Sequence, residues 1–459
     1  MSDTASSPQL KRVMGPGLLL LFIVGDILGT GIYALTGRVA NEVGGAVWLP
    51  FVLAFVVAVI TAFSYLELVT KYPQAAGAAL YTHKAFGIHF LTYMVTFTVM
   101  ASGITSASTA ARAFSANFVE AFDLDFGEGI GITALGLTFM LVVALINLRG
   151  VGESVKTNIV LTCVELSGLL IIILIGMWAL GIGEGDFSRV LEVDTGDRSV
   201  FGAVVAGTAL AFFAMVGFED SVNMAEECKN PIRIFPRVLL LGLGITGLIY
   251  VLVSITAIAL VPAVELGTGD TPLLKVVEAG APAFPVGIFA FITMFAVANT
   301  ALINMLMASR LVYGIAREGV LPAALGRVHP TRRTPYVAIV FTTLLAFGLI
   351  TFVGEVPELG GTTALLLLIV FAIVNVTVLV LRRRPIDHPH FRTPTVLPVL
   401  GAASCIFLVS PLVDRPVAQY RIAAVLLGLG AVLWLITWFL AKRRGGHGPT
   451  IDPEHLVEK

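Results

Sequence analysis

Charged residues are scarce in this chain of 459 residues, where Asp, Glu, Lys and Arg make up only 13%. Ordinary soluble domains carry about 25%. Hydrophobic residues make up 57% of the chain. This balance excludes an ordinary soluble protein and indicates an all-α integral membrane protein, because helices satisfy their own backbone hydrogen bonds in lipid.

Cysteine is also rare, and the three residues Cys163, Cys228 and Cys405 lie in or next to apolar runs. Their spacing fits neither a disulfide framework nor a zinc site. We therefore expect buried apolar thiols, no metal and no other cofactor.

The sequence contains no GxxxxGK phosphate-binding loop and no loop long enough for a nucleotide-binding domain. ATP hydrolysis on this chain is thus excluded as a driving force. Gradient-coupled transport, exchange, a channel and a membrane enzyme remain. The seven histidines lie in loops or at span edges and form no recognisable catalytic group, so we expect no enzyme.

Long apolar runs are abundant, and about 20 such residues cross a bilayer as a helix. We predict about twelve transmembrane helices, over residues 16–38, 46–68, 88–112, 129–148, 155–181, 200–222, 237–262, 283–309, 335–354, 361–381, 395–413 and 422–441.

The basic residues predict the orientation of these spans. With both termini in the cytoplasm, most of the 29 Lys and Arg residues fall on the cytoplasmic side, as the positive-inside rule requires. The few on the outer side include Arg415 and Arg421. We therefore expect a multi-pass protein of the cell (plasma) membrane with cytoplasmic N- and C-termini.

Two of the spans contain interruptions. In the first, three glycines stand within residues 25–31, next to the carboxyl group of Asp26. In the sixth, Gly217 precedes Glu219 and Asp220. Close helix packing would explain the glycines of span one but not Asp26, and span six could simply end at its interruption.

Spans one and six are five apart, so they cross in opposite directions, as inverted repeats require. Pairs of broken helices form midplane binding sites in secondary transporters. Free N–H groups at a half-helix N-terminus suit a carboxylate, and free carbonyls suit an ammonium group. A broken pair would therefore bind both poles of an amino acid.

Other polar groups also lie deep in the spans. Glu165 of span five lies roughly 15 Å from the cytoplasmic edge and shares a helix face with Asn158 and Thr162. A carboxyl group in hydrocarbon favours its neutral form, which makes Glu165 a candidate proton carrier; structural hydrogen bonds are the alternative. Glu67, near the inner end of span two, fits a gate or a packing role.

Polar stripes run along spans three and eight, at spacings of three and four residues that face the bundle interior. Such stripes often only join helices. Their members are Thr98, Ser102, Thr105 and Thr109 in span three, and Thr293, Thr300 and Asn304 in span eight.

Five ordered stretches of this sequence resemble the amino acid–polyamine–organocation (APC) superfamily, and above all its cationic amino acid transporter and basic permease branches. Each stretch is weak alone, but the order and spacing of the set are specific. They are 27–32; 65–68 with 73–81; 147–150 with 153–158; 217–219 with 229–231 and 236–237; and 309–310 with 317–322.

The resemblance implies a LeuT-type fold with a 5+5 inverted repeat and broken helices 1 and 6. The first repeat would cover residues 15–182 and the second 198–382. Two peripheral helices would follow over 393–442, and residues 1–14 and 443–459 would be cytoplasmic tails.

The resemblance also implies residue roles. The substrate carboxylate would meet the N–H groups of Thr30 and Gly31, and Phe213 would close over the substrate. The ammonium group would meet the carbonyls of Ile27, Phe213 and Val216. Gly29 and Gly217 would lie at the breaks, and Asn304, Ser102 and Thr105 would line the side-chain pocket.

Coupling residues follow from the same resemblance. Glu219 matches a carboxylate implicated in proton-linked transport, and Thr300 matches a residue that helps hold a cation in sodium-coupled relatives. Glu165 replaces a lysine of several proton-coupled relatives, so it could titrate or form a cation site with Thr300. Asp26 is unusual and favours a cationic substrate or a proton relay.

We therefore predict a secondary active transporter that moves amino acids by alternating access, with proton symport preferred. Sodium coupling, an amino acid exchanger and a carrier of polyamines or other amines are the alternatives, and a channel is more remote. The expected partners are a small amino acid, protons or sodium, and the lipid bilayer, without nucleic acid. The sequence selects neither the particular amino acid nor the oligomeric state.

Overall fold

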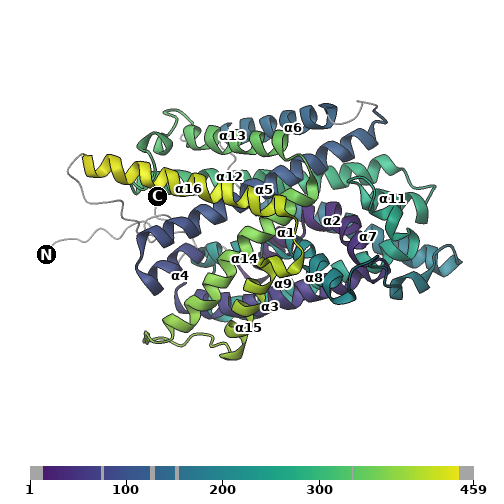
Figure 1. Ribbon diagram of the computed structural model, residues 1–459, viewed down its shortest axis with the longest axis horizontal. Helices are drawn as coiled ribbons and strands as arrows, with labels where there is room; N and C mark the ends of the chain where they lie inside the picture. The colour runs from purple at the N-terminus through teal and green to yellow at the C-terminus, as the bar shows by residue number, and fades with distance from the viewer. Residues whose placement is uncertain (1–13, 74–76, 125–129, 150–154, 333, 444–459) are drawn as a thin grey trace.

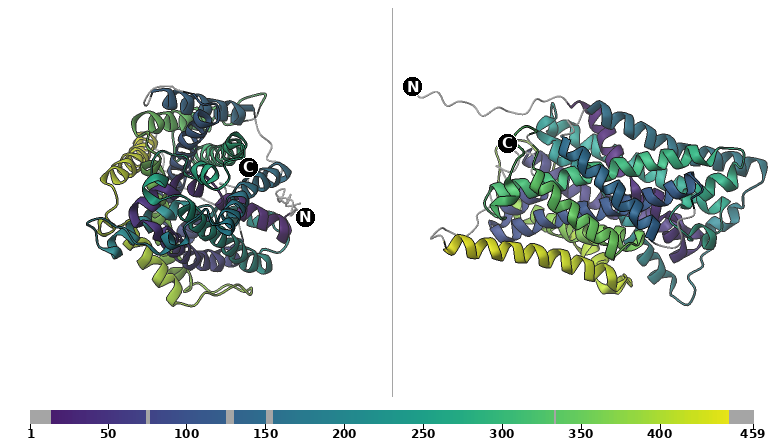
Figure 2. Two further views of the ribbon diagram at one scale, coloured as in Figure 1. Left: turned by 90° about the vertical axis from the view of Figure 1, so that its right-hand side faces the viewer. Right: turned by 90° about the horizontal axis from the view of Figure 1, so that it is seen from above.

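The computed structural model describes residues 14–73, 77–124, 130–149, 155–332 and 334–443. Over these ranges the regular elements are helices, with two isolated β-bridges, Met14–Cys228 and Gly44–Val193. Most of the long helices run along the longest axis of the molecule (Figure 1), and the end-on view shows them gathered into one bundle (Figure 2). The predicted tails fall almost wholly outside the described residues, as does the side chain of Asn158.

The first span consists of two helices, α1 (Pro16–Ile27) and α2 (Thr30–Val43), bent by 41° at the break between them. Leu28 and Gly29 have extended backbone conformations there. The predicted interruption of span one is confirmed, because the helix breaks within the glycine-rich segment.

The sixth span starts as α8 (Val200–Ala211) and continues as the 3₁₀ turns η3 (Phe212–Met215) and η4 (Asp220–Glu227). Gly217 lies between these turns with a φ of 122°, a conformation that residues with a Cβ rarely adopt. The apolar segment runs through the interruption to Ala225. The break of span six is therefore confirmed, and the span does not simply end there.

Long apolar helices occupy most of the other predicted ranges. They are α3 (Trp48–Lys71), α5 (His89–Ala121), α6 (Ile130–Arg149), α7 (Val155–Ile182), α9 (Pro231–Leu260), α12 (Val286–Arg317), α14 (Val356–Leu381) and α16 (Val417–Arg443). With span six, the described part of the chain holds nine segments able to cross a membrane, and the bent pair α1–α2 makes a tenth.

Two shorter apolar helices, α13 (Tyr336–Phe352) and α15 (Val396–Val409), lie at the ninth and eleventh predicted ranges. They have 17 and 14 residues, fewer than the about 20 that an upright span needs. The protein is thus an all-helical membrane protein, and its twelve crossings and inverted repeat stay predictions.

Short helices connect the long ones, and the hydropathy pattern did not indicate them. α4 (Gly77–Phe86) and α11 (Pro272–Gly280) lie toward opposite ends of the bundle (Figure 1). The remaining connecting elements are η1 (Gly45–Val47), η2 (Phe187–Leu191), α10 (Ala263–Leu266), η5 (Ala323–Gly326) and η6 (Pro411–Val413).

The cysteines divide between the interior and the surface. Cys228 and Cys405 are buried as predicted, but Cys163 is exposed, so the prediction for that thiol is wrong. Cys163 shares an outer face of α7 with the exposed side chains of Leu170 and Leu174, which lie seven and eleven residues further on. A thiol tolerates that position because an apolar face of a membrane helix is covered by lipid.

Candidate substrate-binding site

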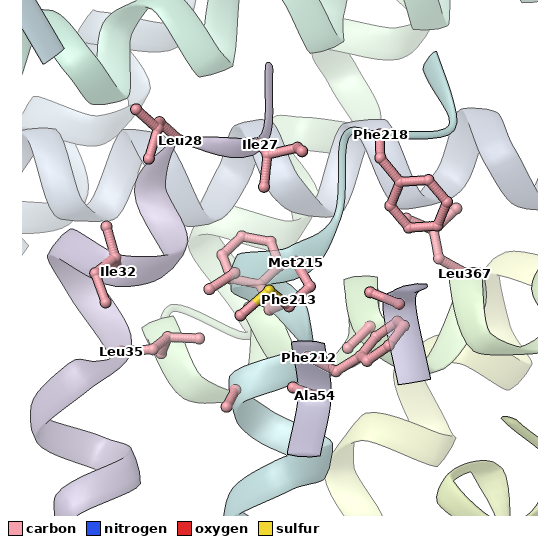
Figure 3. Close-up of a cluster of buried hydrophobic side chains, with 14 of the residues drawn as sticks. Ile27, Leu28, Ile32, Leu35, Ala54, Phe212, Phe213, Met215, Phe218 and Leu367 are labelled. Carbon is pink, nitrogen blue, oxygen red and sulfur yellow. The ribbon is translucent and has the colours of Figure 1, made fainter. Parts of the chain in front are cut away.

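The breaks of spans one and six touch each other through glycine backbone. A Cβ atom on Gly217 would lie 2.4 Å from the carbonyl oxygen of Asp26, and one on Gly31 would lie 2.5 Å from the Cα atom of Ala214. No side chain fits at either position. Figure 3 shows the apolar side chains around this contact, among them Ile27 and Leu28 of span one and Phe213 and Met215 of span six.

The start of α2 offers backbone donors at this contact. Thr30 and Gly31 are its first two residues, and the first four N–H groups of a helix lack intrahelical acceptors. Thr30 is 1% exposed, and its hydroxyl has no hydrogen-bond partner among the described residues. The predicted donors for a substrate carboxylate thus lie buried at the break.

The carbonyls predicted for the substrate ammonium group are partly occupied. The Tyr250 hydroxyl of α9 donates to the Ile27 carbonyl over 2.6 Å. The Val216 N–H donates to the Phe213 carbonyl over 3.4 Å, which is a weak bond. Since a carbonyl oxygen has two lone pairs, both can accept a further donor. Tyr250 could not be predicted from the sequence, because an aromatic residue in an apolar run is usually a packing residue.

Phe213 itself is buried at 5% exposure. Its ring contacts α14, where a Cβ atom on Gly360 would lie 3.3 Å from Cδ1 of Phe213. The aromatic ring predicted to close over the substrate is therefore already packed between the broken spans and α14.

Glu165 of α7 is fully buried, and neither of its carboxyl oxygens has a hydrogen-bond partner among the described residues. The Tyr33 hydroxyl donates instead to the backbone carbonyl of Glu165, at 2.7 Å. The alternative of a carboxyl group held by structural hydrogen bonds is therefore wrong for the described residues. Asp26 lies close enough to Glu165 for negative charges on the two residues to repel each other.

The contact between α1 and α7 holds a second buried polar group without a partner. The hydroxyl of Thr162 forms no hydrogen bond within the described part of the chain. It lies directly against Gly25, where a Cβ atom would be 1.9 Å from Thr162 Oγ1. Thr162 and Glu165 thus follow each other along the face of α7 that meets span one.

Thr300 of α12 lies beside the same break, because a Cβ atom on Gly29 would be 3.1 Å from Thr300 Oγ1. Its hydroxyl donates to the Ala296 carbonyl at 3.3 Å. The Asn304 side-chain amide donates to the Thr300 carbonyl at 2.9 Å and reaches Ser106 Oγ of α5 at 3.4 Å. The predicted residues of span eight therefore connect the break to span three.

Members of the polar stripe of α5 bond mainly within their own helix, and one of them reaches a neighbouring helix. The hydroxyls of Thr105 and Thr363 lie 2.7 Å apart, which ties α5 to α14. The Ser102 hydroxyl donates to its own helix, at the Val99 carbonyl. Ser106 contacts Asn304 although the predicted stripe omits it. It lies four residues after Ser102 on the same helix face, and this spacing was the available signal.

Glu219 lies at the break of span six and bonds back onto it. Its Oε2 atom accepts the Gly217 N–H at 2.9 Å. This bond satisfies a backbone donor that the irregular segment leaves without a helical partner. Glu219 therefore has a structural bond, in contrast to Glu165. Among the described residues, no group of three or more His, Cys, Asp or Glu side chains is placed to hold a metal ion.

Glu67 forms an ion pair with Arg382 that joins α3 to α14. Nε and Nη2 of Arg382 donate to the two carboxylate oxygens of Glu67 at 2.8 and 2.6 Å, and the Thr393 N–H donates to Oε2 at 2.8 Å. Arg382 also donates to the Thr393 carbonyl. This pair fixes the segment before α15 against the ends of two spans.

Comparison with known proteins decides the family. A family model described as amino acid permease matches residues 18–436. The chain belongs to the amino acid permease family of the APC superfamily. The predicted resemblance to that superfamily is confirmed.

Several transporters are similar to this permease over most of its length. The branched-chain amino acid permease BcaP of Bacillus subtilis (strain 168) is 26% identical over 432 residues, which cover 89% of this chain and 90% of the relative. The methylthioribose transporter of the same organism is 28% identical over 436 residues, with the same coverage of both chains. The chloroplastic cationic amino acid transporter 9 of Arabidopsis thaliana is 29% identical over 350 residues, 72% of this chain and 59% of the relative.

Family membership assigns this permease to multi-pass membrane transporters of amino acids rather than to enzymes. The two broken spans, the N–H groups at the start of α2 and the buried Glu165 all lie within the matched residues.

Proposed function

We propose that this permease is a proton-coupled amino acid symporter of the cell membrane that works by alternating access. The observation that carries the proposal is the fully buried Glu165, whose carboxyl oxygens have no partner among the described residues. A buried carboxylate without a partner is costly, whereas the protonated acid is tolerated. Binding and release of a proton at Glu165 would therefore change the stability of the contact between α7 and span one.

The proposed substrate position follows the two breaks. Its carboxylate would accept from the N–H groups of Thr30 and Gly31 at the positive end of α2. Its ammonium group would meet the carbonyls of Phe213, Val216 and Ile27, the last shared with Tyr250. The remaining proposed residues are Gly29 and Gly217 at the breaks, Phe213 as the closing ring, and Asn304, Ser102 and Thr105 around the substrate side chain.

The proposed topology has twelve crossings and cytoplasmic termini. Residues 15–182 and 198–382 would form the two inverted repeats, and residues 393–442 the two peripheral helices. Breaks in the first span of each half support this division, because discontinuous helices at corresponding positions accompany inverted repeats.

Sodium coupling is the second candidate. Thr300 Oγ1 lies beside the break at Gly29. On the neighbouring helix lie oxygens of Thr162 and Glu165 that have no partner among the residues that the structure describes. Hydroxyl and carboxyl oxygens are ligands that a hard cation accepts. Asp26 and Glu219 would contribute negative charge near either ion.

Uptake by proteoliposomes tests the proposal. Radiolabelled leucine, alanine, arginine and methylthioribose would be supplied under an inward proton gradient and then under a sodium gradient, with wild type and Glu165→Gln. We expect proton-driven accumulation of an amino acid that Glu165→Gln abolishes while exchange survives. Glu184→Gln, at an exposed acid after α7, is the matched control and retains accumulation.

Other outcomes would replace the proposal. Accumulation under sodium alone would assign Glu165 and Thr300 to a cation site. Exchange in wild type without accumulation under either gradient would indicate an exchanger. Transport of methylthioribose or of an amine, with no amino acid moved, would contradict the substrate class.

A further inference from the structure

Arg415 is a buried cation in the connection between α15 and α16. It is only 6% exposed, and none of the acidic residues in the described ranges forms an ion pair with it. A guanidinium group keeps its charge at neutral pH, and a buried charge without compensation is costly. The groups around Arg415 must therefore supply the negative potential that a carboxylate would otherwise give.

Four hydrogen bonds surround the guanidinium group, and all of their acceptors are neutral. Nη1 of Arg415 donates to the Gly361 carbonyl at 2.9 Å and to Oε1 of Gln419 at 2.8 Å. Nη2 donates to the carbonyl of Leu408 at 3.2 Å and, in a weaker bond, to that of Ala209 at 3.4 Å. Arg415 thus connects four helices, α14, α16, α15 and α8.

Two of these acceptors lie at the negative ends of helices. Leu408 belongs to the last turn of α15, and Ala209 belongs to the last turn of α8. The last four carbonyls of a helix lack intrahelical donors, and the aligned peptide dipoles place partial negative charge there. The ends of α8 and α15 therefore compensate the charge of Arg415.

The local backbone is shaped to direct Arg415 inward. Asp414 adopts the left-handed conformation with φ of 49°, which Asp tolerates better than most residues, and its side chain is exposed. On the α14 side, a Cβ atom on Gly361 would lie 2.1 Å from Nε2 of Gln419, so glycine is needed for Gln419 to reach its position. The Gln419 amide in turn donates to the Pro357 carbonyl at 3.3 Å.

The end of α8 matters because the break of span six follows it directly. Phe212–Met215 form η3 immediately after Ala211, and Phe213 is the ring that packs against α14 at Gly360. Arg415 bonds to α14 one residue further on, at Gly361. The same two elements, α8–η3 and α14, thus meet both at Phe213 and at Arg415.

We infer that Arg415 is a positioning residue for transport, which holds the end of half-helix α8 against α14 and thereby sets the position of Phe213 and of the carbonyls at the break. It touches no proposed substrate group itself. Arg415 thereby connects α15 and α16, which follow the predicted repeats, to the proposed binding site. Its effect on transport rests on the proposed function.

Hydrogen exchange tests this inference without a substrate. The backbone amides of residues 208–216 would be followed by mass spectrometry in purified, lipid-reconstituted wild type and Arg415→Gln. We expect at least about tenfold faster exchange in the variant, which loses hydrogen bonds to a charged group. Arg415→Lys keeps the charge but not the four bonds, and should exchange at an intermediate rate. Arg421→Gln, at an exposed arginine of α16, should match wild type.

Transport kinetics supply the second readout. For any amino acid that wild type transports, Arg415→Gln should raise KM about tenfold while the maximal rate per folded molecule changes less. Unchanged exchange at residues 208–216 together with an unchanged KM would overturn the inference, because Arg415 would then only contribute to packing. If wild type moves no amino acid, the proposed function fails while the exchange experiment still decides the role of Arg415.

Should Arg415→Gln fail to accumulate in the membrane, Gln419→Leu replaces it. That variant removes one acceptor of Arg415 and leaves three in place. It should raise the exchange rate at residues 208–216 by a smaller factor. A folded Gln419→Leu protein with wild-type exchange there would count against the inference.

Discussion

Close backbone contact at a few glycines holds the two broken spans together. Gly217 has φ of 122°, and the space where its Cβ would stand is filled by the backbone of Asp26. Gly31 meets Ala214 in the same way. These positions leave no room for a side chain, so glycine is required on both sides of the contact.

Gly217→Ala should therefore destabilise the protein and abolish uptake. A non-glycine residue in such a conformation costs about 1–3 kcal/mol, before the collision with Asp26 is counted. Thermal unfolding in detergent and amino acid uptake measure the two effects. Gly244→Ala is the control, because a Cβ there meets nothing within 4 Å on helix α9. A Gly217→Ala protein with wild-type uptake would show that the close contact is dispensable.

Tyr250 determines how one carbonyl of the break is satisfied. Tyr250→Phe keeps the ring, which packs with Phe51 at 6.1 Å between centroids, and removes the donor to Ile27. We expect about 1–3 kcal/mol of lost stability and an altered KM for the transported amino acid. Tyr93→Phe is the matched control, since its hydroxyl donates to the Gly430 carbonyl at 2.9 Å, away from the breaks. Equal KM values for both variants would place Ile27 outside the binding site.

At the scale of elements, separate contacts hold the spans to one another at different positions along their lengths. The glycine contacts join α1–α2 to span six, Arg415 joins the end of α8 to α14 and α15, and Glu67 joins α3 to α14. The Glu67 pair has two parallel bonds and side chains only 2% and 13% exposed. Buried, bidentate geometry of this kind makes each partner depend on the other.

A double-mutant cycle measures that dependence. Glu67→Gln and Arg382→Gln should each lower stability by about 3–5 kcal/mol, because each leaves its partner buried and unpaired. The double variant should lose less than the sum of the two. Thermal unfolding in detergent follows all variants, with the exposed Arg383→Gln as control. Additive losses would mean that the two side chains do not stabilise each other.

At the scale of the whole molecule, strong local signals made the bundle predictable. Long apolar runs predicted the spans, and glycines beside acidic residues predicted both breaks. Thr300 lies beside the break at Gly29 and Asn304 contacts span three at Ser106, while their predicted roles in ion and substrate binding stay predictions. Tyr250 and Arg415 were not recognised, because one resembles a packing residue and the other lies in an apparent outer loop. Their roles arise from helices distant in sequence, as with the exposed Cys163, whose surroundings depend on the packing of α7.

The β-bridge at Met14 joins the start of span one to the end of span six. Met14 accepts from the Lys229 N–H at 3.1 Å and donates to the Glu227 carbonyl at 3.0 Å, so the chain entering α1 is tied to the chain leaving η4. The two broken spans are thus hinged to one another at this end as well as at their midpoints. If α1 moves away from the bundle, the linker between η4 and α9 must move with it or both hydrogen bonds must break. We therefore expect α1 and that linker to move as one rigid unit.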